Sequence, residues 1–388
     1  MLTLSGKVIN IKKDTSIRHV LSLTTNTNLP TALKAQKALL MKDGIGYVEG
    51  YKHYLIFDSN QIKLSSSIDH TILTNEFSYL DDGDVIAIGN KDRLRSIYRS
   101  SSEHNTFLVT EQCNHYCLMC SQPPKTVDDS WLLEEAMEAI RLIPRSAVTI
   151  GITGGEPTLY GQDFIKLVQH LKNWLPETAL HILSNGRAFS DINFAKAYAE
   201  VNHKDVMIGI PIYSSDASRH DYVVQASNAF DETIRGILNL KKFNQRVEIR
   251  VVIHKQTIEG LVDLAEYIAR NLLFVDQVAL MGLEMMGFTR SNIEELWIDP
   301  IEYKDQLSSA VRVLRNYGVN VLVYNHQLCL INKDVEPNYV KSISDWKNEY
   351  ATECEGCERK SECGGFFSSS IKYRYSSHIK PFITSNVQ

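Results

Sequence analysis

From Thr106 onward, short runs of β-forming residues alternate with amphipathic helical stretches, and this alternation limits the fold more than any other feature. The predicted strands cover residues 106–110, 147–153, 179–184, 205–213, 247–253, 275–281 and 319–324. Between them, apolar residues recur at helical spacing, as at Leu261, Leu264 and Ile268. Such alternation predicts an α/β fold with a parallel sheet, open or curled into a barrel, that binds ligands at the carboxyl ends of its strands.

Two segments of different character flank this region. Residues 1–105 contain short β-type runs broken by turn residues, with one short helix expected near residues 29–41. The clearest runs are GKVINI, GIGYVEGY, HYLIFD and DGDVIAIG. Regular pattern fades after the last predicted strand, and a cysteine-rich tail follows. We therefore expect a β-rich domain at 1–105, an α/β domain at 106–325 and a cysteine-rich extension at 326–388.

The composition argues against several function classes. The net charge is −5 and no long basic run occurs, so we expect no nucleic-acid partner. No segment reaches the roughly 18 consecutive apolar residues of a membrane helix. The first residues also lack the features of a secretory signal, so we expect a cytoplasmic protein without a membrane partner. In that compartment the seven cysteines are expected as metal ligands, catalytic thiols or small core residues rather than as disulfides.

Three cysteines lie close together, directly after the first predicted strand, at Cys113, Cys117 and Cys120. Thiolates are the usual protein ligands of iron–sulfur clusters. Three thiolates are one too few for a four-iron cluster, so one iron would stay open to another ligand, as in reactive metal sites. Taken alone, the three residues also fit a zinc site completed by His115, or three buried thiols.

A second motif, Gly154-Gly155-Glu156-Pro157, ends the next predicted strand. Two glycines at a strand end let the backbone approach a ligand closely. Pro157 fixes the turn, and Glu156 offers an acceptor for an ammonium group. Alone, this motif also fits an ordinary strand-to-helix connection.

Together, Cys113-x3-Cys117-x2-Cys120 and the Gly154–Pro157 turn resemble the signature of the radical S-adenosylmethionine (radical SAM) superfamily. The resemblance implies a partial (β/α)6 barrel whose three cysteines hold a [4Fe–4S] cluster. The fourth iron would bind the amino and carboxylate groups of SAM. The residue before the last cysteine, commonly aromatic in the family, is Met119 here, whose thioether can still lie against an adenine-sized ring.

The same resemblance implies roles for residues around SAM. Gly154, Gly155 and Pro157 would contribute backbone, and Glu156 its side chain, to hold the SAM amino group. Asn185 would lie near the pocket, Ser214 on the ribose side, and Arg250 would pair with the SAM carboxylate. An Asn-Gly turn, a helix cap and a surface charge, respectively, stay open as alternatives for these last three residues.

The other four cysteines, Cys329, Cys354, Cys357 and Cys363, lie in the C-terminal extension. Four thiolates satisfy one [4Fe–4S] cluster or one zinc ion. The spacing Cys354-x2-Cys357-x5-Cys363 resembles part of the SPASM and twitch extensions, which carry auxiliary clusters in radical SAM enzymes acting on peptides. Position 367 is Phe367, where a full SPASM domain usually has a further cysteine. We therefore expect one auxiliary [4Fe–4S] cluster, with Cys329 or His326 as its fourth ligand.

The residues around both cysteine sets look closest to the maturases of His-Xaa-Ser peptide systems. Such a family member would act beside a second radical SAM partner, with an electron donor, on a small His-Xaa-Ser-repeat protein. Its reduced cluster would cleave SAM to methionine and a 5′-deoxyadenosyl radical, and the auxiliary cluster would accept or relay the substrate electron. Two alternatives stay open: a radical SAM enzyme acting on a small molecule in cofactor biosynthesis, and a zinc-stapled binding protein without catalysis.

Overall fold

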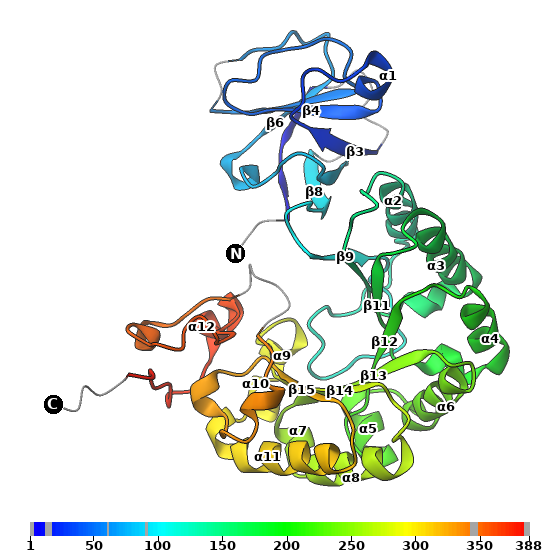
Figure 1. The fold of residues 1–388 in the computed structure, drawn as a ribbon, viewed down its shortest axis with the longest axis vertical. Helices are drawn as coiled ribbons and strands as arrows, with labels where there is room; N and C mark the ends of the chain where they lie inside the picture. Colours follow the sequence, from blue (N-terminus) through cyan, green and yellow to red (C-terminus); the bar gives the residue numbers. More distant parts are fainter. Residues whose placement is uncertain (1–3, 12–17, 60–61, 90–91, 342–347, 384–388) are drawn as a thin grey trace.

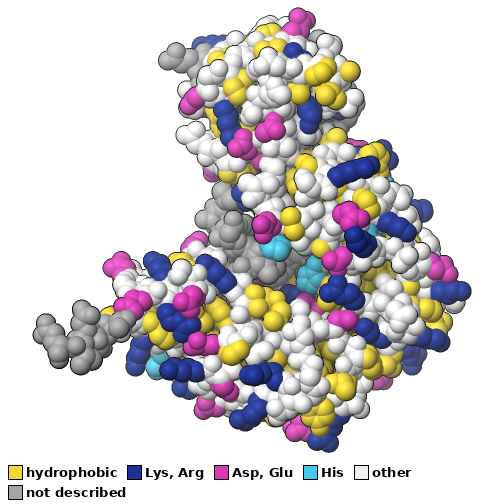
Figure 2. All heavy atoms as spheres, in the orientation of Figure 1, with side chains coloured by type: hydrophobic (Ala, Val, Ile, Leu, Met, Phe, Trp, Pro, Cys, Tyr) yellow, Lys and Arg dark blue, Asp and Glu magenta, His cyan; other side chains and the backbone are white. Residues whose placement is uncertain are grey.

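The computed structural model describes residues 4–11, 18–59, 62–89, 92–341 and 348–383. Within these ranges the named strands form two sheets, one of eight strands and one of seven. The seven-stranded sheet and its helices form a crescent (Figure 1). The N-terminal sheet lies at one end of the crescent and the C-terminal tail at the other. On the face seen in Figure 2, Lys and Arg side chains are interspersed with Asp and Glu.

The N-terminal sheet closes on itself. Its order is β1-β8-β7-β3-β4-β5-β6-β2. Only Val8 separates β1 from β2, yet these strands pair antiparallel with β8 and β6 at opposite ends of this order. Closure leaves few unpaired strand edges. The strands are β1 (Ser5–Lys7), β2 (Ile9–Ile11), β3 (His19–Thr24), β4 (Lys37–Met41), β5 (His53–Phe57), β6 (His70–Leu73), β7 (Val85–Ile88) and β8 (Arg93–Tyr98).

The β-rich prediction for this region is confirmed, with two local differences. Residues 44–51 form a loop instead of a strand. Residues 37–41 form β4, and only α1 (Thr31–Lys34) is helical nearby. The apolar run of β4 is explained by burial of both its faces: Leu40 packs in the core of the closed sheet, and Leu39 packs outside it under the covering loops. A second short helix, η1, spans Asn75–Phe77.

The second sheet is entirely parallel, in the order β15-β14-β13-β12-β11-β10-β9. All seven predicted strands are present with small shifts at their ends, so the expected barrel is confirmed, with β15 as an added seventh strand. The strands are β9 (His104–Leu108), β10 (Thr149–Thr153), β11 (Ala179–Leu183), β12 (Val206–Pro211), β13 (Arg246–Ile253), β14 (Gln277–Gly282) and β15 (Val321–Tyr324).

Helices between these strands cover the convex side of the crescent (Figure 1). The longer ones are α2 (Trp131–Ile140), α3 (Gln162–Trp174), α4 (Ile192–Glu200), α5 (Ala217–Val224), α6 (Ala229–Lys242), α8 (Leu261–Asn271) and α11 (Pro300–Asn316). Shorter ones are η2 (Pro157–Tyr160), η3 (Arg187–Ser190), α7 (Lys255–Ile258), α9 (Phe288–Ser291) and α10 (Ile293–Leu296). The tail after β15 contains η4 (Leu328–Leu330), η5 (Glu336–Asn338), η7 (Thr352–Cys354) and α12 (Ser368–Tyr373).

Alternation along the strands sends apolar side chains to the helices and leaves the other face for polar groups. Ile150 and Ile152 of β10, for example, are fully buried in the main core, whereas Gly151 between them is only half-buried. On β13, Glu248 and Arg250 occupy the face opposite to Ile249 and Val251. The polar face therefore lies inside the crescent. None of the helices in the described ranges combines the length and the apolar character needed to cross a bilayer.

A charged joint fastens the N-terminal sheet to α2. The Glu135 side chain is only 4% exposed. It accepts a hydrogen bond from Arg95, and its Oε2 lies 3.5 Å from Arg18 Nε. Both guanidinium groups lie over the ring of Trp131, at 3.8 Å for Arg18 and 4.9 Å for Arg95. The joint thus combines ion pairing with cation–π contacts.

Replacing Glu135 by alanine is expected to lower the free energy of unfolding. The change leaves two guanidinium groups facing each other without their carboxylate. Because these groups remain about a third exposed, we expect a loss of about 2 kcal/mol, below the range for a fully buried pair. Urea denaturation measures it. The exposed Glu138 on the same helix is the control, and an equal loss in Glu138→Ala would contradict the role of the joint.

Candidate metal and cofactor site

The three-cysteine loop follows β9 at its carboxyl end and lies inside the crescent (Figure 1). Main-chain hydrogen bonds attach it to the turn after β10. Gly155 N donates to Thr110 O at 2.9 Å, and Glu156 N donates to Gln112 O at 2.8 Å. The two motifs that lie far apart in the sequence therefore form one unit.

Gly154 and Gly155 have no room for a side chain. A Cβ atom on Gly155 would lie 2.2 Å from Gln112 O and 2.9 Å from Cys113 Cβ. On Gly154 it would lie 2.7 Å from Thr110 O. We expected these glycines to let the backbone approach a ligand; the structure shows that they let the cysteine loop approach.

Glu156 is buried, with 1% of its surface exposed, and links two strand ends. Its Oε1 accepts hydrogen bonds from Thr158 N (2.9 Å), Thr158 Oγ1 (2.5 Å) and Ser184 Oγ (2.9 Å). Its Oε2 accepts from Asn185 N at 2.6 Å. Burial raises the pKa of Glu156, whereas these hydrogen bonds oppose that rise. With one protein donor, Oε2 keeps the greater capacity to accept a further hydrogen bond.

Asn185 reaches the cysteine loop directly. Its Nδ2 donates to Oδ1 of Asn114 at 2.6 Å, and its own Oδ1 accepts from Arg187 N at 3.0 Å. Asn185 therefore lies beside the first cysteine set, and its place near the SAM pocket stays a prediction. Asn114, between Cys113 and Cys117, is a contact that sequence reasoning missed.

Asp129 is a second missed residue, and it holds the start of the loop. Its carboxylate accepts hydrogen bonds from Thr110 Oγ1 (3.0 Å), Gln112 Nε2 (3.2 Å) and Tyr160 OH (3.0 Å), and from Glu111 N. Burial acts to raise the pKa of Asp129, but these hydrogen bonds outweigh it and hold the pKa below its usual value. In the sequence, Asp129 fits only a helix start before α2.

The other side of the loop is held by α5 and by the segment after β14. Leu118 N donates to Val223 O at 3.0 Å. Phe288 N donates to Cys120 O at 2.8 Å. Gly287, with φ at +51°, permits this approach, because a Cβ there would lie 2.2 Å from Cys120 O. No sequence signal pointed to this segment.

The three thiols are half-buried, and their surroundings disfavour an uncompensated thiolate. Burial raises the pKa of all three, that of Cys113 to about 12, and neighbouring thiols raise those of Cys113 and Cys117 further. His115 N donates to Cys113 Sγ at 3.3 Å. Bound iron would supply the positive charge that such thiolates need. The donor set therefore fits a cluster with three protein ligands.

Met119 and Ser214 lie beside the loop but in packed surroundings. Met119 is 7% exposed and belongs to an apolar cluster with Tyr213, against which Cys117 packs. Its thioether is thus mostly covered by protein. Ser214 Oγ accepts a hydrogen bond from Asp216 N at 3.1 Å, so it forms a turn before α5.

Arg250 lies inside the crescent and is not a surface charge. Its Nη1 donates to Glu248 Oε1 at 2.6 Å. His181 Nε2 lies 3.4 Å from the same oxygen, and Gln277 donates to the other one. Burial acts to raise the pKa of Glu248, but His181 and Arg250 outweigh it and bring the pKa to about 2. Arg250 would share its charge between Glu248 and any bound carboxylate.

The four remaining cysteines surround one pocket in the tail. Cys329, Cys354, Cys357 and Cys363 all line it, with Phe366 and Phe382 among the other walls. Gly365 N donates to Cys363 Sγ and Phe382 N to Cys357 Sγ, each at 3.4 Å. The common pocket supports Cys329 as the fourth member of this set.

His326, the other candidate ligand, is engaged elsewhere. It is 1% exposed. Its Nε2 lies 2.9 Å from Tyr303 OH, and its Nδ1 lies 2.7 Å from Tyr324 O. Both ring nitrogens therefore have protein partners.

In the described part of the chain, no three His, Cys, Asp or Glu side chains lie in an arrangement that would hold a single metal ion.

A parallel half-barrel with a three-cysteine loop at its carboxyl edge, joined to a Gly-Gly-Glu-Pro turn, defines the radical SAM class. Residues 107–268 match the sequence profile of the Radical SAM superfamily. That segment runs from β9 into α8 and includes both motifs. These residues therefore form a radical SAM domain, and the superfamily implies S-adenosylmethionine and a [4Fe–4S] cluster as its cofactors.

Solved structures of this class are similar in fold. The structure of native anSMEcpe with bound AdoMet has 14% sequence identity and a TM-score of 0.51, with 71% of this chain and 92% of that chain covered. Streptococcus suis SuiB bound to precursor peptide SuiA has 15% identity and a TM-score of 0.47, covering 59% of this chain and 50% of SuiB. A radical SAM methyltransferase from Sphaerobacter thermophilus has 14% identity and a TM-score of 0.44, covering 64% and 75%. The chain thus spans about half the length of the SuiB structure that it matches.

Proposed function

We propose that this protein is a radical SAM maturase that modifies a peptide or small protein. Cys113, Cys117 and Cys120 would hold the SAM-binding [4Fe–4S] cluster. When bound, the cluster and SAM supply a 5′-deoxyadenosyl radical that abstracts a hydrogen atom from a substrate carbon. The observation that carries the proposal is the division of all seven cysteines into two sets, three in a loop at the barrel edge and four around one pocket.

The protein would position SAM with the residues that connect the strand ends. Glu156 Oε2 and the Gly154–Pro157 backbone would accept hydrogen bonds from the SAM amino group. Asn185, through Asn114, would keep the cysteine loop in place. Ser214 would lie on the ribose side, and Arg250 would pair with the SAM carboxylate while Glu248 fixes its guanidinium group.

The second set, Cys329, Cys354, Cys357 and Cys363, would hold an auxiliary [4Fe–4S] cluster. Closed by four thiolates, that cluster would be suited to electron transfer rather than to binding substrate. The Cys354–Cys363 spacing, which resembles SPASM and twitch extensions of peptide-modifying enzymes, supports a peptide substrate. The proposed partners are a His-Xaa-Ser-repeat protein, a second radical SAM protein and an electron donor.

Replacing Cys357 by alanine tests the auxiliary cluster. We expect the iron content to fall from about eight to about four per chain, as two four-iron clusters require. Uncoupled SAM cleavage should continue while modification of the substrate stops. Ser361→Ala, in the same segment, is the matched control and should keep both activities. Loss of SAM cleavage in Cys357→Ala would contradict an auxiliary role and indicate a role in folding.

Mass spectrometry of a His-Xaa-Ser-repeat peptide coexpressed with this protein tests the substrate. A mass change that requires intact Cys113 supports the maturase. The cells also express the second radical SAM protein. If the peptide stays unchanged in them, while this protein purified from the same cells cleaves SAM, the result would reject that peptide and favour a small-molecule substrate.

A further inference from the structure

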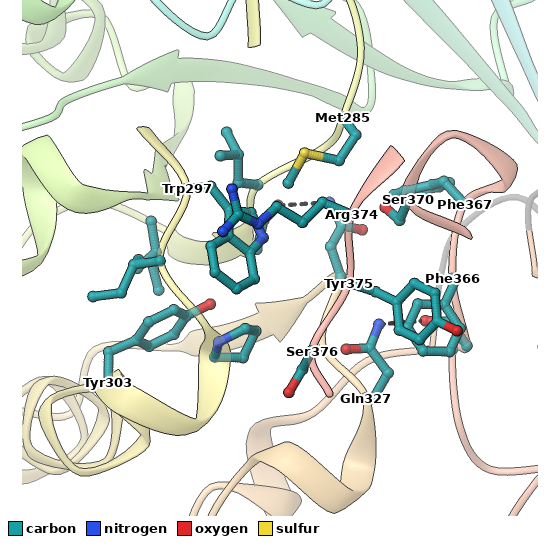
Figure 3. Close-up of a pocket in the computed structure, with 18 residues that line it drawn as sticks. Met285, Trp297, Tyr303, Gln327, Phe366, Phe367, Ser370, Arg374, Tyr375 and Ser376 are labelled. Atoms are coloured by element: carbon teal, nitrogen blue, oxygen red, sulfur yellow. Dashed lines mark hydrogen bonds between the residues drawn. The ribbon is translucent and has the colours of Figure 1, made fainter. Parts of the chain in front are cut away.

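A second pocket lies between the barrel and the tail, and the proposed cofactors do not account for it. One wall is formed by the carboxyl ends of β13, β14 and β15, at Ile253, Gly282 and Asn325. The opposite wall is formed by tail residues 364–367 and 374–376 (Figure 3). The space between the walls of this tail pocket, counted together with the open solvent that it joins, is about 690 Å³.

The tail pocket adjoins both cysteine sets. Gln327, Gly365 and Phe366 line it and also line the pocket of the four cysteines. On the other side, its lining residue Met285 lies three positions before Phe288, whose main-chain N–H holds Cys120 O. The tail pocket therefore shares a wall with the pocket of the four cysteines and adjoins the segment that contacts the three-cysteine loop.

Apolar and aromatic side chains line part of the pocket, beside polar side chains and main-chain groups. Met285, Tyr303 and Phe366 are each at most 3% exposed, and Phe366 packs edge-on against Tyr375 with ring centroids 5.1 Å apart. The hydroxyl groups of the two tyrosines already form hydrogen bonds, that of Tyr303 with His326 and that of Tyr375 with Glu353. These walls suit a large apolar side chain, which would be removed from water when it packs against them.

Arg374 is the single charged residue among the residues that line the pocket. Its guanidinium centre lies 4.1 Å above the ring of Trp297, as Figure 3 shows. Its Nη1 lies 3.1 Å from Glu294 Oε1, but the Glu294 side chain is 84% exposed. An ion pair with so exposed a partner contributes little, about 0–1 kcal/mol, so another carboxylate can replace it. The stacked guanidinium remains oriented when that exchange occurs.

Resting on the proposed function, we propose that the tail pocket anchors the peptide substrate by a large apolar side chain and a carboxylate next to it. The apolar side chain packs between Trp297, Tyr303 and Phe366, and the carboxylate pairs with Arg374 in place of Glu294. An acidic side chain or the C-terminal carboxylate of the peptide would supply this group. Anchoring there keeps the neighbouring peptide residues at the barrel mouth.

Fluorescence anisotropy of short labelled peptides tests this assignment without any turnover. The protein is the full chain, purified anaerobically with its clusters and without SAM. The first probe is fluorescein-Gly-Gly-Phe-Asp-Gly-Gly-amide, compared with versions in which Ala replaces Phe or Asn replaces Asp. We expect each replacement to weaken binding by about tenfold, as loss of one buried side chain or one charged hydrogen bond implies. A second pair, fluorescein-Gly-Gly-Gly-Phe with a free or an amidated C-terminus, compares the two carboxylate sources.

Variants identify the residues that cause these preferences. Arg374→Gln is expected to remove the preference for Asp over Asn and to keep the preference for Phe over Ala. Trp297→Ala is expected to weaken both. Arg290→Gln is the matched control: Arg290 also joins the tail, through Tyr373 OH at 2.8 Å, but does not line the pocket, so binding should be unchanged.

The outcomes separate this proposal from the proposed function. Absence of a carboxylate preference for both probe pairs, or equal losses in Arg290→Gln and Arg374→Gln, would overturn the anchor site. The same preparations are assayed for 5′-deoxyadenosine without peptide. SAM cleavage without the binding preferences would reject the anchor alone. The preferences without SAM cleavage would support the anchor and reject the radical function.

Discussion

Replacement of Cys113, Cys117 and Cys120 by alanine is expected to reduce formation of 5′-deoxyadenosine from SAM to the uncatalysed background, a loss of at least about 10⁶-fold. The three thiols are the proposed ligands of the cluster that reduces SAM. The fold should survive, because main-chain groups rather than thiols attach the loop, such as Gly155 N to Thr110 O. Chromatography of anaerobic reactions with dithionite measures the product, and about four irons should stay in the tail.

Ser121→Ala, in the same loop, is the control for this triple variant, because it changes an exposed side chain without removing a thiol. It should cleave SAM at the unmodified rate. Product formation by the triple alanine variant above the level of a protein-free reaction would contradict the assignment of the cluster.

Gly155→Ala is expected to prevent assembly of the same cluster without touching a thiol. The added Cβ would lie 2.2 Å from Gln112 O, a backbone atom that can move only with the cysteine loop. We expect loss of about four irons, a fall of at least about 100-fold in SAM cleavage, and destabilisation by about 1–3 kcal/mol. Iron analysis, product assays and urea denaturation measure the three effects.

Gly260→Ala is the matched control, since nothing lies within 4 Å of a Cβ at Gly260 and its φ is −96°. Its stability should change by less than about 0.5 kcal/mol and its iron content should not change. If Gly155→Ala kept full iron and full cleavage, the close packing of the turn on the loop would have no functional importance.

The parallel sheet was predictable because its signal is local. Strands such as β10 and β13 carry apolar residues that helices must cover. Each strand is one continuous run of residues, so its pattern can be recognised without knowing its neighbours. Residues 37–41 were wrongly expected to belong to a helix, because their burial depends on segments that lie far away in the sequence. The run Ala-Leu-Leu-Met in β4 pairs with β3 and β5, and its two faces are buried by the core of the closed sheet and by the loops that cover the sheet. No local pattern reveals these distant neighbours.

In the candidate site, only the residues that belong to the two sequence motifs were predictable. The thiols and the Gly154–Pro157 turn follow from spacing, whereas Asp129, Asn114 and Gly287 act through contacts between distant segments. Likewise, the neighbours of Cys329 depend on how the tail folds back against it. Gly155 illustrates the limit: its small size was recognisable, but the loop backbone that requires it was not.

The central claim is that one iron at the three-cysteine loop lacks a protein ligand and binds SAM. Electron–nuclear double resonance of the reduced protein with SAM carrying ¹⁵N in its amino group tests it most directly. We predict a resolved coupling between the ¹⁵N nucleus and the cluster spin, present in Cys357→Ala and absent after replacement of Cys113, Cys117 and Cys120. A reduced cluster at these cysteines whose spectrum shows no such coupling at saturating SAM would contradict the account.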